Sequence, residues 1–322
     1  MKRTELHVVS GKGGTGKTTV AAALAIALAS GGRKVLLCEV EGRQGIARLL
    51  DVDPLPYEER RVSVGLDGGE VYALAIDPES ALLEYLQMFY RLGRAGRALD
   101  RFGVIDFATT IAPGVRDVLL TGKVYEAAGR QGEEAYDAIV MDAPPTGRIA
   151  RFLNVNSEVA GLAKAGPIRR QADSIMEMMR AETTRVHLVS VLEEMPVQET
   201  LDGIAELTGT GLPVGHVILN LVRSDLVSAD TAAALADGTL GAEAVASALQ
   251  SASLSPDTAP VLVAGGREQV ERQQLQTDQR AVIARSDRPV VELPYLPDGV
   301  DLGSLYDLAR SLRDDLLDGG AS

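Results

Sequence analysis

The most informative segment of this 322-residue chain reads Ser10-Gly11-Lys12-Gly13-Gly14-Thr15-Gly16-Lys17-Thr18-Thr19. It lies between an apolar run at 6–9 and an Ala- and Leu-rich segment that begins near Thr18. This strand-loop-helix order is the context in which the pattern G-x-x-x-x-G-K-T folds as a phosphate-binding loop, or P-loop. Its glycines let successive N–H groups turn inward, and the helix behind adds positive charge at its amino terminus. The segment therefore predicts a cradle for the phosphates of a nucleoside triphosphate.

The side chains of the loop have separate expected roles. Lys17 reaches the β- and γ-phosphates, Thr18 offers its hydroxyl to Mg²⁺, and Thr19 contacts the α-phosphate. The remaining nucleotide contacts are assigned to Gly11, Lys12, Gly13, Gly14, Thr15 and Gly16. Lys12 is a second lysine, on the part of the loop that we expect to face away from its own helix. From there it reaches another subunit's nucleotide, and a solvated loop lysine is the alternative.

Composition argues against several classes of protein. Lys and Arg number 32 against 45 Asp and Glu, and no basic cluster is longer than a pair, so nucleic acid is not an expected partner. No secretory leader is indicated, and the longest apolar run, 20–29, is half of what a membrane span needs. We therefore expect a cytoplasmic protein that meets a membrane only through a partner. Cys38 is the only cysteine, which leaves no Cys-x-x-Cys metal site.

Two acidic residues end the apolar run at 35–41, which indicates a second parallel strand. With a period of two, Glu39 and Glu41 point the same way at the carboxyl end of that strand, where ligands bind in open α/β sheets. We place Glu41 near the γ-phosphate, as the catalytic group that orients the attacking water. A carboxylate solvated at a strand end is the alternative.

A buried strand at 136–142 supplies the second half of the predicted site. Its final residue, Asp142, is expected to hold Mg²⁺ through water, opposite Thr18. In the loop that follows, Thr146 and Gly147 place a backbone N–H against the γ-phosphate, so that the loop moves when the phosphate leaves.

The base of the nucleotide is assigned to the carboxyl ends of later strands, predicted at 186–192, 214–221 and 289–294. Asn220 is expected to pair with adenine through its amide, and the loop that starts at Pro294 is expected to close over the base. A guanine-reading site would carry a carboxylate where Arg223 stands, so ATP is favoured over GTP.

The whole pattern predicts an α/β fold of the P-loop NTPase type in a single domain, 1–322. Its doubly wound, mostly parallel sheet has about seven or eight strands, including one at 71–76. A helical subdomain is inserted at about 78–135 and 157–185, and the methionines near 176–179 either face a client or fill the core. Residues 224–260 read as surface helices and loops of little chemical content. The three histidines are interpreted as structural.

With both nucleotide loops in view, the chain resembles a bacterial member of the arsenite-pump ATPase family, which includes the targeting factor for tail-anchored membrane proteins. The resemblance rests on the deviant P-loop K-G-G-x-G-K-T-T, on D-A-P-P-T-G-R at 142–148 with Arg-Phe-Leu at 151–153, on Pro-Gly at 113–114, on Glu-Thr at 199–200 and on Asn220. It implies a dimer that closes face to face on ATP, Lys12 acting in trans, adenine at Asn220 and Pro294, and a client groove on the helical subdomain.

Three departures from the family pattern bear on function. Glu41 stands where the family has a shorter water-positioning acid, which leaves the rate of hydrolysis open, and Arg148 replaces a histidine. The cysteines that bind arsenite or zinc in the family are missing, so neither site is expected.

The sequence thus supports an ATP-hydrolysing switch, dimeric with itself or a paralogue, that binds and releases a protein or lipid client. Two alternatives stay open: a positioning ATPase acting on membrane or DNA, and a metabolic enzyme that couples ATP to another substrate. The first lacks the expected basic surface, and the second lacks acid–base residues outside the nucleotide site.

Overall fold

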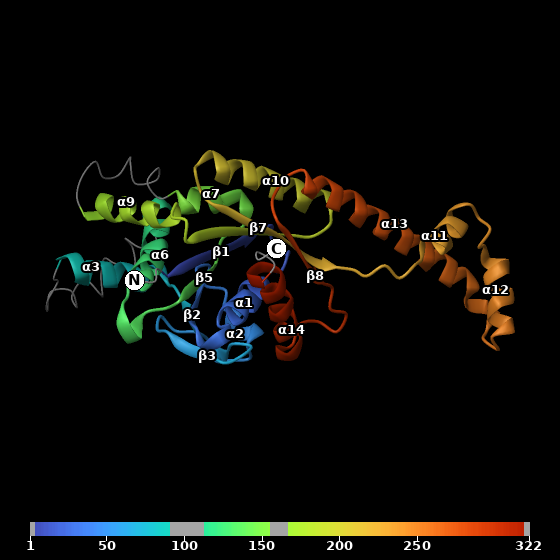
Figure 1. The fold of residues 1–322 in the computed structure, drawn as a ribbon, viewed down its shortest axis with the longest axis horizontal. Coiled ribbons are helices and arrows are strands. Elements are labelled where there is room, and N and C mark those ends of the chain that lie inside the picture. Colours follow the sequence, from blue (N-terminus) through green and yellow to red (C-terminus); the bar gives the residue numbers. More distant parts are fainter. Residues whose placement is uncertain (1–3, 91–112, 155–166, 319–322) are drawn as a thin grey trace.

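The computed structural model describes residues 4–90, 113–154 and 167–318, and its centre is an eight-stranded sheet (Figure 1). The strand order is β3-β4-β2-β5-β1-β6-β7-β8, with β3 antiparallel to β4 and every other neighbouring pair parallel. The strands are β1 (Glu5–Gly11), β2 (Lys34–Glu39), β3 (Arg60–Val64), β4 (Glu70–Ala75), β5 (Ala138–Asp142), β6 (Thr184–Ser190), β7 (Val214–Val222) and β8 (Val290–Pro294). The mostly parallel α/β fold predicted from the sequence is confirmed.

Helices cover both faces of the sheet. One face packs against α1 (Lys17–Leu28), α2 (Gly45–Leu49) and α14 (Leu302–Arg313), and α1 is buried at every position from Val20 to Leu28. The other face packs against α3 (Pro78–Tyr90), α6 (Pro113–Ala128), α7 (Thr146–Leu153), α9 (Pro167–Met179) and α10 (Glu194–Gly209). Short single turns lie at η1 (Ser30–Gly32), η2 (Gly132–Glu134), η3 (Pro256–Thr258) and η4 (Asp314–Asp318). None of the described helices is long and apolar enough to cross a bilayer.

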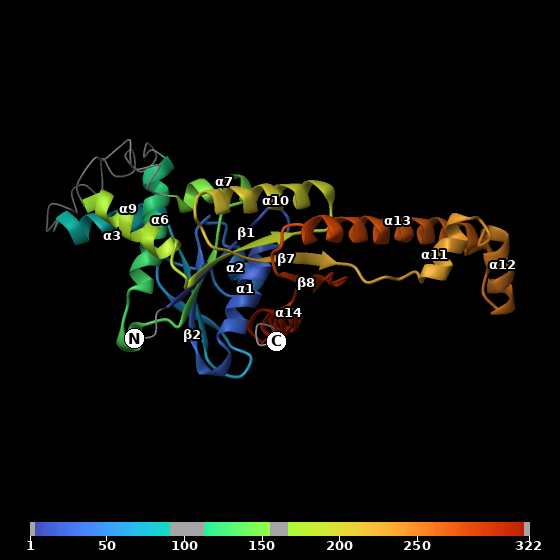
Figure 2. The same cartoon turned by 45° about the horizontal axis from the view of Figure 1, so that its top comes forward.

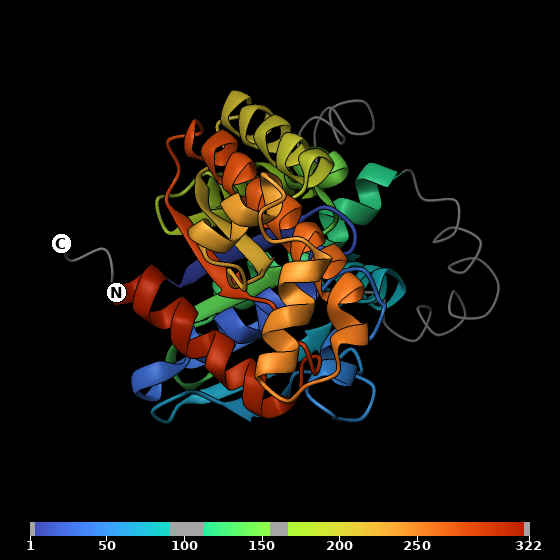
Figure 3. The same cartoon turned by 90° about the vertical axis from the view of Figure 1, so that its right-hand side faces the viewer.

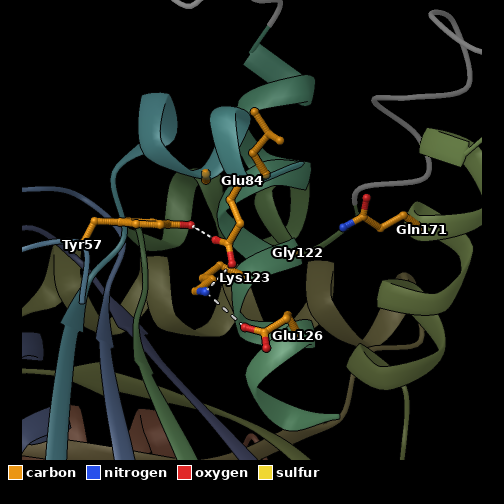
Figure 4. Close-up of a pocket in the computed structure, with 8 residues that line it drawn as sticks. Tyr57, Glu84, Gly122, Lys123, Glu126 and Gln171 are labelled. Carbon is orange, nitrogen blue, oxygen red and sulfur yellow. Dashed lines mark hydrogen bonds and ion pairs between the residues drawn. The ribbon is translucent and has the colours of Figure 1, made fainter. Parts of the chain in front are cut away.

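A polar cluster fastens α3 and α6 to the segment before β3 (Figure 4). The Tyr57 hydroxyl donates to Glu84 at 2.6 Å, and the Lys123 ammonium lies 2.8 Å from Glu84 and 3.1 Å from Glu126. These residues border a cavity of about 20 Å³, which is the size of one water site. Helices α3, α6 and α9 fall within the bounds of the predicted helical subdomain, and their buried side chains join the core on this face. Its segments 91–112 and 157–166 lie outside the described residues.

A helical projection extends beyond the sheet at the end opposite α3 and α9 (Figures 1 and 2). It consists of α11 (Ala229–Ala236), α12 (Ala242–Ser251) and the first part of α13 (Ala259–Ala284). We call residues 224–275 the arm. Seen end-on, α11 and α12 lie in front of the sheet (Figure 3). The sequence predicted surface helices here but not their projection from the body.

Two strand assignments differ from the sequence prediction. Strand β3 was not predicted, because it is a short edge strand with exposed arginines and a bulge after Arg61. Strand β2 ends at Glu39, two residues before the predicted end, and the chain then turns through Gly42 and Gln44 with positive φ angles of 65° and 55°. The alternation of side chains along a strand therefore ends at Glu39 and does not determine the direction of Glu41.

Candidate nucleotide site

The P-loop connects the carboxyl end of β1 to α1, and close packing makes two of its glycines obligatory. Gly16 has a φ of 85°, and a Cβ there would lie 2.3 Å from the Asn220 amide nitrogen. A Cβ on Gly11 would lie 2.1 Å from the Val189 carbonyl oxygen of β6. Gly13 faces open space, because no atom lies within 4 Å of its Cβ position. The loop therefore packs tightly at its two ends and is open at its apex, as a phosphate cradle requires.

The predicted metal-binding pair is assembled from β5 and α1. The Thr18 hydroxyl donates to the Asp142 carboxylate at 2.7 Å. Burial raises the pKa of Asp142 from 3.8 to about 6, against the opposing effects of the Thr18 hydrogen bond and the Lys17 charge. Burial likewise lowers the pKa of Lys17, which Asp142 and Glu41 oppose. A buried carboxylate of this kind gains from any cation placed beside it.

The two acids after β2 have different surroundings. Glu39 is buried, and its carboxylate accepts hydrogen bonds from the backbone N–H groups of Gly45 and Ile46 at 3.3 and 3.2 Å. It therefore holds the start of α2, and the expectation that it faces the nucleotide together with Glu41 stays a prediction. Glu41 forms an ion pair with Arg43 at 3.6 Å, and its side chain is 20% exposed. Its role in orienting water stays a prediction.

The loop after β5 leads directly into α7. The Ser10 hydroxyl donates to the Pro144 carbonyl at 2.6 Å, which ties this loop to the strand before the P-loop. Thr146 is buried, and its hydroxyl has no hydrogen-bond partner within the part of the chain that the structure describes. Gly147 is exposed, with no atom within 4 Å of its Cβ position. The Thr146 hydroxyl is thus a buried polar group available to a ligand.

Lys12 extends toward α10. Its ammonium lies 2.9 Å from the Glu199 carboxylate, with the two side chains 33% and 37% exposed. The Lys12 carbonyl oxygen accepts hydrogen bonds from the Thr15 hydroxyl at 2.9 Å and from the Lys17 ammonium at 3.3 Å. The backbone of Lys12 therefore supports the cradle, while its side chain is held by a different element.

The predicted base contacts lie at the ends of β7 and β8. Asn220 is buried and donates its amide to the Thr15 carbonyl at 2.9 Å, and the bulge after it places Leu221 at a φ of 58°. A groove of about 370 Å³ lies beside these ends and is lined by Pro294, Tyr295 and Arg223, among others. The Arg223 guanidinium lies 3.8 Å from the centre of the Tyr295 ring. The adenine roles of Asn220 and Pro294 stay predictions, and the Arg223–Tyr295 stack had no signal in the sequence.

Comparison with known proteins identifies the family. The family model described as anion-transporting ATPase matches residues 4–184. The chain belongs to the anion-transporting ATPase family. ATPase BagA of Mycobacterium tuberculosis is 52% identical over 315 residues, which cover 95% of this chain and 92% of that protein.

More distant members of the anion-transporting ATPase family carry a more specific name. The arsenical pump-driving ATPase of Acidiphilium multivorum is 26% identical over an alignment of 332 positions, and the alignment covers 94% of this chain and 54% of that protein. A putative arsenical pump-driving ATPase of Chlorobaculum tepidum is 26% identical over 253 residues, which cover 66% of this chain and 59% of that protein.

In this member of the anion-transporting ATPase family, cysteine and histidine are placed away from the cradle. Cys38 is fully buried in β2, and burial raises the pKa of its thiol. The rings of His7 and His187 stack at 5.3 Å, His216 follows at 5.6 Å, and burial lowers the pKa of His187. No group of three or more His, Cys, Asp or Glu side chains among the described residues is arranged to hold a metal ion.

Proposed function

We propose that this member of the anion-transporting ATPase family is an Mg²⁺-dependent ATPase that closes as a dimer on ATP and thereby binds and releases a client. The observation that carries the proposal is the placement of Lys12, whose side chain leaves its own cradle and pairs with Glu199. One P-loop lysine, Lys17, already serves that cradle. A second lysine that is half-exposed at the same loop is suited to a nucleotide held by another subunit.

The side chains of the site fit Mg²⁺ and ATP. The Thr18 hydroxyl and the Asp142 carboxylate lie 2.7 Å apart and offer the oxygen atoms that Mg²⁺ prefers, with Thr18 as a direct ligand and Asp142 acting through water. Such an ion would neutralise charge on the β- and γ-phosphates during transfer. The open P-loop apex and the buried, unpartnered Thr146 hydroxyl provide room and a polar contact for the phosphates.

In the proposed reaction, water attacks the γ-phosphorus of ATP, and ADP leaves. Lys17 binds the β- and γ-phosphate oxygens, and Glu41 orients the water and accepts a hydrogen bond from it. Lys12 of the second subunit adds positive charge where negative charge moves toward the leaving oxygen. Asn220 and Pro294 hold the adenine end.

Contacts on the far side of the site provide a path for the conformational change. The Thr146 methyl group lies 3.5 Å from the position that a Cβ on Gly203 of α10 would take. The same helix, α10, also carries Glu199. Helix α7 further contacts α6, one of the helices that we assign to client binding. Loss of the γ-phosphate would therefore shift α7. This movement would reach both the ion pair between Lys12 and Glu199, which we call the latch, and the helical subdomain.

The relatives named arsenical pump-driving ATPases suggest arsenite as one client, and we propose that this chain does not carry it. Arsenite is bound by thiolates, and Cys38, the only cysteine, is fully buried with a raised pKa. The proposed client is a protein or a lipid, and the second subunit is an identical chain or a paralogue.

The test compares wild type with Lys12→Ala by ATP hydrolysis and by light scattering with Mg²⁺ and ATP. We expect wild-type activity per subunit to rise with protein concentration and the variant to lose both this rise and ATP-dependent dimers. Arg60→Ala, which removes an exposed cation on β3, is the control and should behave as wild type. Unchanged hydrolysis and dimerisation in Lys12→Ala would rule out the proposal.

The client is sought separately, with Asp142→Asn trapped with ATP or ADP and analysed by mass spectrometry of what co-purifies. A protein or lipid that depends on the nucleotide supports the carrier role. Recovery of only the chain or a paralogue in both states contradicts it.

A further inference from the structure

The arm begins at the edge of the sheet that carries the nucleotide site. The strands β1, β5, β6, β7 and β8 are parallel, so their carboxyl ends share one edge. Helix α13 returns to the start of β8, and its buried residues in the body are Gln276, Gln279 and Ile283. No residue of α13 from 264 to 275 is buried, a stretch of about 18 Å at 1.5 Å per residue. The helix therefore extends past the carboxyl edge (Figures 1 and 2).

Two glutamines fix the direction of the arm at its base. The Gln276 amide donates to the Arg223 carbonyl at 3.0 Å and accepts from the Arg223 N–H at 2.9 Å. One turn earlier, Gln273 makes the same pair of bonds to Val227, at 3.0 and 3.3 Å. The backbone N–H and C=O groups of Arg223 and Val227 thus both have hydrogen-bond partners, as they would beside a neighbouring strand. The arm is thus held in place before it meets any partner, which lowers the entropic cost of docking.

The arm exposes large apolar side chains. Leu226 and Val261 are 72% and 73% exposed, and Leu254 and Leu262 are more than half exposed. Leu254, Val261 and Leu262 come from a single stretch of nine residues that runs through η3 into the first turn of α13, at the far end of the arm (Figure 1). Apolar side chains gathered on a rigid projection are typical of a surface that a partner covers.

Charge indicates which surface covers them. The outer part of the arm, 224–266, contains no Lys, Arg or His and five acidic residues, and the whole arm, 224–275, carries seven acidic residues against two arginines, Arg267 and Arg272. A complementary surface must therefore be basic. At the carboxyl edge of the same chain, Arg43 follows β2 with its side chain 74% exposed, and Arg148 is exposed on α7.

We propose that the arm of each subunit docks on a second copy of this chain, against the segment 42–48 and helix α7 beside its nucleotide. This inference rests on the proposed function in the form with two identical chains, which face each other at the carboxyl edges that carry their nucleotide sites. An arm that extends past this edge meets the partner there. The partner's Arg43 and Arg148 then complement the acids of the arm, while Leu254, Val261 and Leu262 become buried.

Chemical crosslinking tests the contact directly. Because the native Cys38 is buried, Leu254→Cys introduces a single reactive thiol at the end of the arm, and Val64→Cys does the same on β3 as a control. Each is labelled with a thiol-reactive photocrosslinker, and ¹⁵N-labelled and unlabelled chains are mixed with Mg²⁺ and a slowly hydrolysed ATP analogue. We expect crosslinks from position 254 to residues 42–48 or 146–153 of the other chain. Crosslinks confined to one chain, or equal from position 64, would overturn the proposal.

A binding measurement separates this inference from the proposed function. The double variant Val261→Ser/Leu262→Ser should weaken the ATP-dependent dimer by about tenfold to a hundredfold, as loss of buried apolar anchors does. Val64→Ser, on an exposed valine outside the arm, should leave the dimer unchanged. If wild type dimerises and the double variant dimerises equally well, the arm proposal fails and the dimeric switch stands. If wild type stays monomeric with ATP, both fail.

Discussion

Asp142→Asn should make the nucleotide-free protein more stable while it abolishes Mg²⁺-dependent hydrolysis. Burial holds the pKa of Asp142 at about 6, against 3.8 in the unfolded chain. The ionised carboxylate is therefore disfavoured in the folded state at neutral pH. Asparagine keeps an oxygen for the Thr18 hydroxyl and carries no charge, so it removes this penalty.

The expected gain follows from the two pKa values. A difference of about two units at about 1.4 kcal/mol each gives about 3 kcal/mol at pH 7.5. Between pH 6 and 3.8 the folded Asp142 binds more protons than the unfolded one, so wild type gains stability as the pH falls through this window. The advantage of the variant is therefore complete above about pH 7 and falls to about half at pH 5.

Urea unfolding of both proteins, without nucleotide or Mg²⁺, measures this advantage at pH 7.5 and pH 5. Addition of Mg²⁺ and ATP at one hundred times the dissociation constant should then stabilise wild type by about 2.7 kcal/mol and the variant by less. A variant no more stable than wild type at pH 7.5, or a difference that does not shrink toward pH 5, would refute the reasoning.

Three further substitutions test separate parts of the site. Glu199→Gln releases Lys12 from a half-exposed ion pair, so the ATP-bound dimer should tighten about twofold to fivefold in sedimentation experiments, and a weaker dimer would contradict the latch. Gly16→Ala should abolish ATP binding in calorimetry, because its Cβ would lie 2.3 Å from the Asn220 amide nitrogen, whereas Gly209→Ala, with nothing within 4 Å of its Cβ position on α10, should bind ATP normally. Glu41→Gln should lower kcat at least tenfold with little change in ATP affinity, and an unchanged kcat would remove this residue from the chemistry.

The sequence was most informative where local pattern and chemistry coincide. The order β1, P-loop, α1 could be predicted because spacing and flanks are fixed by what a phosphate cradle needs. Asp142 was predicted in the same way, because a buried strand that ends in an acid is typical of a magnesium site, and the structure places it beside Thr18. Continuous apolar runs then sufficed for most of the remaining parallel strands.

What could not be predicted depends on contacts between distant segments. Glu39 caps α2 only because the chain turns after β2, and alternation alone made it a partner of Glu41. The arm is fixed by Gln273 and Gln276, which bond to backbone about fifty residues earlier. An Ala-, Ser- and Asp-rich sequence carries no signal of that direction.

Complementation between two inactive variants tests the shared site most directly. Asp142→Asn lacks the metal-binding carboxylate in both sites but retains Lys12, and Lys12→Ala has the reverse defect. If Lys12 acts in trans, each mixed dimer contains one complete site, and an equimolar mixture should regain about one quarter of wild-type hydrolysis, since about half of random dimers are mixed. If the mixture stays as inactive as its components, Lys12 acts within its own subunit and the account of a shared site is wrong.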